Sequence, residues 1–260
     1  MLISVHSFRG GTGKSNTTAN LAGLLAATGA RVAIVDTDIQ SPGIHVLFGL
    51  DNTPGPSLNE YLWGTSEISD LAIDVTDRVR ANREVADSGA LFLIRSSVNA
   101  SDIARILHEG YDMSRLKTGF QDLKTELNLD YLLIDTHPGL NEETLLSFMV
   151  TDILLLILRP DRQDFEGTAI TVSIARRLKV PEMLLVVNKV PGAIDREDLL
   201  AQLAENYDAE AIAALPLAED VAMNASSDLF SITNPEHDWS QQLQVVADRI
   251  RASSSAKPGN

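Results

Sequence analysis

The chain of 260 residues contains no cysteine. Disulfide bridges, thiolate zinc sites, cysteine-ligated iron–sulfur clusters and cysteine nucleophiles are therefore excluded within it, and a reducing compartment fits this composition. Long hydrophobic runs are also lacking, because the longest aliphatic run, Ile153–Leu158, is far shorter than the ~20 residues that span a bilayer. The first residues lack a basic leader followed by an apolar segment, so we expect no signal peptide and a cytoplasmic protein.

Basic residues are scarce relative to acidic ones. The chain has 21 Lys and Arg against 36 Asp and Glu, and the formal net charge of −15 disfavours binding to nucleic acid or anionic lipid. A small basic cluster (Arg176, Arg177, Lys179) leaves nucleic acid possible but not favoured. Between residues 195 and 238 there are eleven acidic residues and a single basic one, which predicts either a solvated surface or a docking face for a basic partner protein.

Short apolar runs recur along the chain, separated by segments with helical spacing. Nearly continuous apolar runs are typical of strands covered on both faces. The pattern predicts an α/β, doubly wound, mostly parallel sheet of about seven or eight strands with helices on both faces. The expected strands are 2–8, 32–35, 91–94, 131–134, 153–158, 183–187 and 211–215, and the expected helices are 14–28, 102–108, 113–127, 142–150, 165–178 and 195–205.

The sequence shows no internal repeat and no linker rich in proline or glycine, so we expect one domain over residues 1–252. Residues 51–89 have the least regular pattern and are expected to form a surface excursion, with a loop at 53–57. The small, polar residues 253–260 predict a disordered tail.

A last helix is expected from about 238 to 252. Its apolar stripe is compatible with packing on the sheet, and it has too few basic residues for a stable membrane anchor. The stripe consists of Trp239, Leu243, Val246 and Ile250.

The strongest motif is glycine-rich and lies between the first expected strand and the first expected helix. Glycines let successive backbone N–H groups point at one anion, and the helix that follows adds the positive end of its dipole. Lys14 supplies a mobile charge for the β- and γ-phosphates, and the Ser15 hydroxyl is placed to bind magnesium. The residues expected to bind phosphate are Gly10, Gly11, Thr12, Gly13, Lys14, Ser15 and Asn16.

This loop resembles the variant Walker motif of the MinD/ParA family of P-loop ATPases, Lys-Gly-Gly-x-Gly-Lys-Ser/Thr. The resemblance implies that the first lysine reaches the partner's nucleotide across a dimer, and Arg9 stands at that place. Because arginine is always charged and offers a planar fork, Arg9 could contact a phosphate in trans. The alternative is that Arg9 binds a carboxylate of its own subunit.

Two acidic motifs end expected strands, and such strand ends face the nucleotide crevice in a doubly wound sheet. The first is Asp36-Thr37-Asp38. The resemblance implies that Asp38 positions the attacking water and supports magnesium, with Asp36 behind it. The alternative is that both aspartates cap the turn at Ser41. Since neighbouring carboxylates repel each other, a magnesium ion between them is the better explanation.

The second acidic motif, Leu132-Leu133-Ile134-Asp135, has the Walker B form, so Asp135 joins Ser15 and Asp38 as an expected magnesium ligand. The following Thr136–Gly139 resembles the second switch loop of the family, with His137 at a variable position. Phosphoryl transfer of this kind relies on positioning and charge, so we expect no direct chemical role for His137.

The base is expected to be adenine. Asn188 and Lys189 are not followed by the aspartate that a guanine-specific Asn-Lys-x-Asp motif requires. The resemblance implies that Asn188 contacts the base and that the backbone at Pro216 and Leu217 reads it.

Together the motifs predict an ATPase switch with ATP/ADP and Mg²⁺ as cofactors and Lys14, Asp38 and Arg9 as catalytic residues. The resemblance implies an ATP-dependent homodimer, slow partner-stimulated hydrolysis and a protein partner that the sequence does not identify. Two other hypotheses remain: a nucleotide-binding adaptor that hardly hydrolyses, and a P-loop enzyme that acts on a small acceptor.

Overall fold

The computed structural model describes residues 1–51, 53, 55–82, 86 and 88–256, and these form a single sheet of eight strands. The strand order is β3-β4-β2-β5-β1-β6-β7-β8. Every pairing is parallel except that of the edge strand β3 with β4. The strands are β1 (Leu2–His6), β2 (Arg31–Asp36), β3 (Ile73–Asp74), β4 (Ala90–Ile94), β5 (Tyr131–Asp135), β6 (Ile153–Leu158), β7 (Glu182–Val190) and β8 (Glu210–Pro216).

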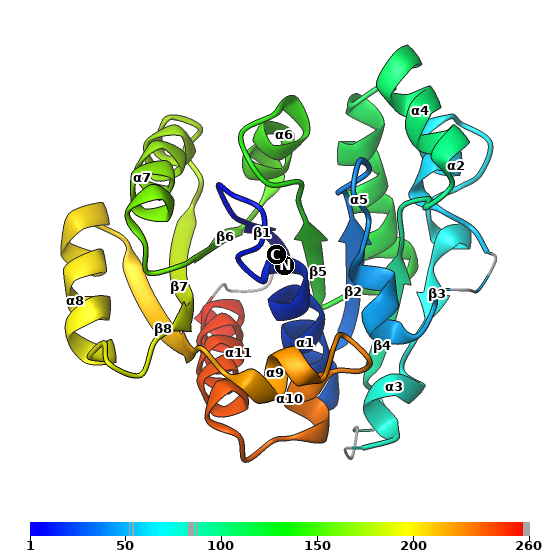
Figure 1. Cartoon of the computed structure of the whole chain (residues 1–260). Coiled ribbons are helices and arrows are strands. Elements are labelled where there is room, and N and C mark those ends of the chain that lie inside the picture. Colours follow the sequence, from blue (N-terminus) through cyan, green and yellow to red (C-terminus); the bar gives the residue numbers. More distant parts are fainter. Residues whose placement is uncertain (52, 54, 83–85, 87, 257–260) are drawn as a thin grey trace.

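Helices cover both faces of the sheet (Figure 1). Alternate side chains of each inner strand point to opposite faces, so each face has its own apolar core. One face carries α1 (Lys14–Ala27), η1 (Ile44–Phe48), α3 (Asp77–Arg80), α10 (Phe230–Thr233) and α11 (Asp238–Ala256). The other carries α2 (Leu58–Leu62), η2 (Ser69–Leu71), α4 (Ala100–Glu109), α5 (Ser114–Glu126), α6 (Glu142–Val150), α7 (Arg162–Arg177) and α8 (Arg196–Tyr207). The short helix α9 (Glu219–Met223) follows β8.

The expected fold class is confirmed. All residues of β1, β5 and β6 are buried, as the continuous apolar runs predicted for strands covered on both faces. The seven expected strands and seven expected helices are present with ends shifted by a few residues. Gly29, directly after the first expected helix, has a left-handed φ of 96° and donates its N–H to the Ala26 carbonyl, as is typical at the end of a helix.

The expectation of a surface excursion at residues 51–89 is wrong. Leu58, Tyr61, Leu71 and Val79 are at most 3% exposed, and α2, η2, β3 and α3 all contribute to the apolar core. Elements this short contain too few turns or alternations to produce a periodic pattern. In the loop expected at 53–57, residues 53 and 55–57 belong to no helix or strand, and residue 54 lies outside the described residues.

The prediction of a disordered tail from residue 253 is wrong for residues 253–256. Helix α11 continues to Ala256, so residues 253–256 are helical, and 257–260 lie outside the described residues. The apolar stripe of α11 is buried as expected, and α11 packs beside α1 and against β8. Within the described residues, no helix is long and apolar enough to cross a membrane.

The order of the strands determines where a ligand can bind. The chain moves from β1 to one side of the sheet, returns through β5, and continues on the other side through β6. Ligands of doubly wound sheets bind at the carboxyl ends of the strands at such a reversal. The loop after β1, the Asp36 end of β2 and the Asp135 end of β5 meet there.

Candidate nucleotide site

The glycine-rich loop is held in a curled conformation before α1. Gly13 is the N-cap of α1 with a left-handed φ of 91°, and its carbonyl accepts the N–H of Thr17 at 2.9 Å. Two side chains from the end of β7 support the loop from outside. Asn188 Nδ2 donates to the Thr12 carbonyl at 2.8 Å, and Lys189 Nζ donates to the Gly11 carbonyl at 2.8 Å. These bonds satisfy two carbonyls of the loop from outside, which suits a loop whose N–H groups bind an anion.

We predict that Gly13→Ala destabilises the fold. A Cβ at residue 13 would lie 2.4 Å from Asn188 Nδ2, and the left-handed φ is unfavourable for alanine. We expect a loss of about 1–3 kcal/mol in the free energy of unfolding. Gly10→Ala is the matched control, because a Cβ there meets no described atom within 4 Å. Denaturant unfolding without nucleotide measures both variants, and equal midpoints for the two would refute this role of Gly13.

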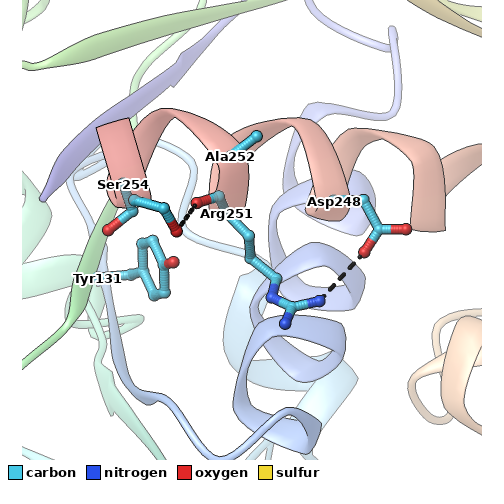
Figure 2. Close-up of a pocket in the computed structure, with 6 residues that line it drawn as sticks. Tyr131, Asp248, Arg251, Ala252 and Ser254 are labelled. Carbon is cyan, nitrogen blue, oxygen red and sulfur yellow. Dashed lines mark hydrogen bonds and ion pairs between the residues drawn. The ribbon is translucent and has the colours of Figure 1, made fainter. Parts of the chain in front are cut away.

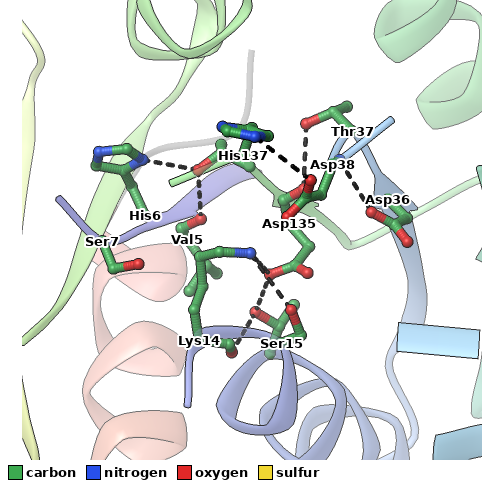
Figure 3. Close-up of polar contacts among 12 residues, drawn as sticks. Val5, His6, Ser7, Lys14, Ser15, Asp36, Thr37, Asp38, Asp135 and His137 are labelled. Atoms are coloured by element: carbon green, nitrogen blue, oxygen red, sulfur yellow. Dashed lines mark hydrogen bonds and ion pairs between the residues drawn. The ribbon is translucent and has the colours of Figure 1, made fainter. Parts of the chain in front are cut away.

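Lys14 and Asp135 form a buried ion pair beneath the loop (Figure 3). Their side chains are 6% and 1% exposed, and Lys14 Nζ donates to Asp135 Oδ1 at 2.8 Å. Thr18 Oγ1 donates to the same oxygen at 2.9 Å. The structure therefore brings the expected phosphate-binding lysine and the expected Walker B aspartate into direct contact.

Asp36 and Asp135 are neighbours across β2 and β5. Burial and the charge of Asp135 raise the pKa of Asp36 well above its usual range. Oδ2 of each aspartate is buried and accepts no hydrogen bond from the residues that the structure describes. A divalent cation bound near these two oxygens would reduce the repulsion between the carboxylates of Asp36 and Asp135.

The residues present fit a magnesium ion that also binds phosphate. The structure, over its described residues, contains no group of three or more His, Asp or Glu side chains suited to hold a metal alone. Mg²⁺ usually binds through one or two protein oxygens together with substrate phosphates and water. Ser15, whose hydroxyl lies 3.4 Å from Lys14 Nζ, and Asp135 are placed to supply those protein oxygens.

Asp38 lies at the rim of the same site. Its Oδ1 accepts the N–H of Ser41 at 3.1 Å and the hydroxyl of Ser41 at 2.8 Å, so the turn-capping alternative describes its contacts in this structure. Nε2 of His137 lies 3.8 Å from Asp38 Oδ1, and Nδ1 of His137 bonds to the Pro138 carbonyl at 2.6 Å. The loop after β2 and the loop after β5 are thus connected through these side chains.

A buried histidine, His6, links the end of β1 to the loop after β5. Thr136 Oγ1 donates to the Val5 carbonyl at 3.0 Å and therefore accepts from Nδ1 of His6 at 2.8 Å. Burial, followed by the charge of Lys14, lowers the pKa of His6 to about 3. His6 is therefore neutral at physiological pH and acts as a fixed hydrogen-bond donor.

The residues expected to bind nucleotide line two adjoining hollows of about 290 Å³ each. The first is the phosphate hollow, lined by Ser7, residues 10–16, Asp38, Ser41 and Pro138. The second is the apolar hollow, lined by Gly13, Asn16, Asn188, Lys189, Pro216, Leu217, Ala218, Val221, Ala222 and Trp239. Gly13 and Asn16 line both, so the two hollows meet at the start of α1.

Three residues of this site were missed by the sequence reasoning or placed in another role. Asn188, expected to contact the base, uses its amide nitrogen to hold the loop. For Lys189 the sequence supports only an argument about the base, whereas in the structure its side chain holds the Gly11 carbonyl of the loop. Trp239 was assigned to the apolar stripe of the last helix, and its N–H also bonds to Asn188 Oδ1 at 3.4 Å.

Arg9 faces its own subunit. Its Nη1 lies 3.7 Å from Asp161 Oδ1 and from Asp164 Oδ1, which is the alternative that the sequence left open. The Arg9 side chain is 37% exposed and lines neither hollow. The neighbouring Phe8 packs against Gly167 of α7, where an added Cβ would lie 2.0 Å from the ring. These contacts hold Arg9 at the surface beside the phosphate loop.

Other sequence signals contribute mainly to structure. Arg176 of the small basic cluster bonds to the carbonyls of Tyr207 and Asp208, so it is occupied within the chain. In the acidic segment 195–238, Asp195 caps α8, and Asp238 forms an ion pair with Arg196 at 2.6 Å. That pair lowers the pKa of Asp238.

A further hollow lies near the amino ends of the strands, between Tyr131 at the start of β5 and the end of α11 (Figure 2). Its charged residues, Asp248 and Arg251, are about half exposed and pair with each other at 3.3 Å. We assign it no role in nucleotide binding, because it is distant from the carboxyl ends of the strands.

Residues 3–232 match the family described as the CobQ/CobB/MinD/ParA nucleotide binding domain, and the chain belongs to this family. Among its relatives, an uncharacterized ATP-binding protein of Methanocaldococcus jannaschii is 27% identical over 72% of this chain and 64% of its own length. An iron–sulfur cluster carrier protein of Pseudomonas fragi is 26% identical over 87% and 76%. The antiactivator FleN of Pseudomonas aeruginosa is 26% identical over 80% and 68%. The chain thus spans about two thirds to three quarters of the length of these relatives.

Solved structures agree on the fold. The cell division ATPase MinD of Pyrococcus furiosus superimposes with a TM-score of 0.79 at 21% identity, covering 97% of this chain and 98% of that one. MinD of Pyrococcus horikoshii, complexed with Mg-ADP, gives a TM-score of 0.78 at 20% identity, covering 99% of each chain. The fold is therefore that of the MinD structures.

Proposed function

We propose that this chain is a magnesium-dependent ATPase switch that dimerises around ATP and positions or regulates a partner protein. The observation that carries the proposal is the pair of hollows that meet at Gly13 and Asn16. A polar hollow surrounded by backbone N–H groups suits a triphosphate, and an adjoining apolar hollow suits a base. A cytoplasmic location remains part of this proposal.

Each polar group has a role in this proposal. Lys14 moves from Asp135 to the β- and γ-phosphates, which frees a carboxylate oxygen for magnesium. Asp38 leaves Ser41 and holds the attacking water, and Arg9 leaves Asp161 and Asp164 to reach the partner's nucleotide. The adenine ring occupies the apolar hollow beside Pro216 and Leu217. Bound magnesium supplies charge neutralisation at the phosphates.

Iron–sulfur carriers are among the relatives, but this chain is not proposed to carry a cluster. It contains no cysteine, and thiolates are the usual ligands of such clusters. An antiactivator is also among the relatives, which supports a regulatory role through a partner. We favour regulation or positioning of a partner over cluster transfer on this ground.

The Asp38→Ala variant tests the proposed cycle. We expect MgATP binding to persist, phosphate release to fall at least ~100-fold, and the ATP-bound dimer to accumulate, because the water-positioning carboxylate is gone. Asp70→Ala in η2, which removes an exposed aspartate, should behave like the unaltered chain. Phosphate release is measured alongside sedimentation with ATP or ADP.

A pull-down with the Asp38→Ala protein then addresses the partner. Partners recovered with ATP but not with ADP are expected if the dimer is the binding form. The same recovery with both nucleotides would contradict a nucleotide-gated switch. Phosphate release equal to that of the unaltered chain would contradict the role of Asp38, and very slow release by the unaltered chain itself would favour the adaptor hypothesis.

A further inference from the structure

Trp239, the second residue of α11, lines the apolar hollow of the candidate nucleotide site. The family match covers residues 3–232, and α11 begins after it, at Asp238. Trp239 is 2% exposed and lines the apolar hollow together with Gly13 and Asn188. A large aromatic ring at this place fixes one wall of the hollow.

The indole N–H of Trp239 also sets the orientation of Asn188. It donates to Asn188 Oδ1 at 3.4 Å, and the backbone N–H of Lys189 donates to the same oxygen at 2.9 Å. With its oxygen fixed on this side, the Asn188 amide directs Nδ2 to the Thr12 carbonyl at 2.8 Å. A flipped amide would place two donors against each other and leave the Thr12 carbonyl without this bond.

The start of α11 is itself fixed to the other wall of the apolar hollow. The backbone N–H of Trp239 donates to His237 Nδ1 at 3.0 Å, and Nε2 of His237 lies 3.6 Å from Asp220 in α9. Phe230 meets the rings of His237 and Trp239 edge to face, with centroids 5.1 and 6.0 Å away. Helix α9 contributes Val221 and Ala222 to the hollow, so one cluster connects α9, α11 and the phosphate loop.

We propose that Trp239 is a positioning residue for nucleotide binding, acting through Asn188 on the phosphate loop, so that docking of α11 and nucleotide affinity are coupled. The inference rests on the proposed function, because it requires that the two hollows bind ATP. The coupling runs in both directions, since whatever favours the docked helix also favours the nucleotide.

The test compares Trp239→Phe with Trp63→Phe, which alters the chain's other tryptophan at the end of α2. Trp239→Phe keeps an aromatic wall but removes the N–H, and we expect the Kd for MgATP to rise about fivefold. Trp63→Phe should bind as the unaltered chain does. In an Asn188→Ala background, Trp239→Phe should add little, because the residue through which it acts is missing.

An unchanged Kd for MgATP in Trp239→Phe would overturn the proposal. So would a rise in Kd on adding Trp239→Phe to Asn188→Ala that equals the rise it causes in the unaltered chain. If Trp239→Phe does not fold, the Trp63→Phe protein provides the second measurement, since Trp239 is then its sole tryptophan. A change in its fluorescence on saturation with MgATP supports the proposal, and no change refutes it. Failure of the unaltered chain to bind MgATP would instead contradict the proposed function.

Discussion

Lys14→Ala is expected to weaken MgATP binding at least ~100-fold. Lys14 is the cation of the phosphate loop, and it lies at the start of α1 and lines the phosphate hollow. Charge-assisted bonds to phosphate in a site shielded from water are strong, and the other loop groups are neutral donors that cannot replace the charge. Isothermal titration calorimetry measures the loss directly.

The same substitution affects stability, and this effect must be separated from binding. It leaves Asp135 buried without its cation, and we expect a cost of about 3–5 kcal/mol in the free energy of unfolding. The double variant Lys14→Ala/Asp135→Asn should recover much of that stability but not the ATP binding. Lys117→Ala, at an exposed lysine of α5, controls for the change in net charge. Binding by folded Lys14→Ala at the unaltered affinity would refute the assignment of the site.

Arg9→Ala is expected to abolish the ATP-dependent dimer while changing the Kd of the single chain for ATP by less than about threefold. Arg9 lines neither hollow of its own subunit, so its removal leaves those walls intact. An arginine that reaches a partner's phosphate neutralises charge at the dimer interface, and truncating such a contact weakens association strongly. Sedimentation velocity over a range of protein concentrations measures the dimer constant.

Two variants sharpen the Arg9 prediction. Arg9→Lys, which has the residue of the family motif, should keep most of the dimer. Arg162→Ala in α7 removes a 91% exposed arginine that pairs with Glu166, and it should leave the dimer unchanged. If Arg9→Ala dimerises with ATP as readily as the unaltered chain, Arg9 serves only its own subunit through Asp161 and Asp164.

The phosphate loop and the acidic strand ends could be predicted from the sequence because their signals are local. A glycine-rich segment between a buried strand and a helix specifies its own backbone shape, as the φ of Gly13 shows. The meeting of Asp36 and Asp135 follows from parallel pairing of two recognised strands. The phosphate hollow is lined mainly by residues expected to bind nucleotide, whereas half of the residues that line the apolar hollow were not expected there: Lys189, Ala218, Val221, Ala222 and Trp239.

The contacts between side chains could not be predicted in the same way. The bond from Trp239 to Asn188 joins residues 51 positions apart, and it depends on how α11 docks beside β7 and β8. The ion pairs of Arg9 with Asp161 and Asp164 depend on how α7 begins after β6. The buried short elements α2 and α3 were missed because four or five residues give no period to detect.

The central claim is that the paired hollows bind ATP and that ATP joins two chains. Light scattering during size exclusion, with MgATP or MgADP in the running buffer, tests it most directly. We expect one chain of 28.2 kDa with MgADP and twice that mass with MgATP. The same single-chain mass in both nucleotides, with calorimetry showing one ATP bound per chain, would contradict the dimeric switch.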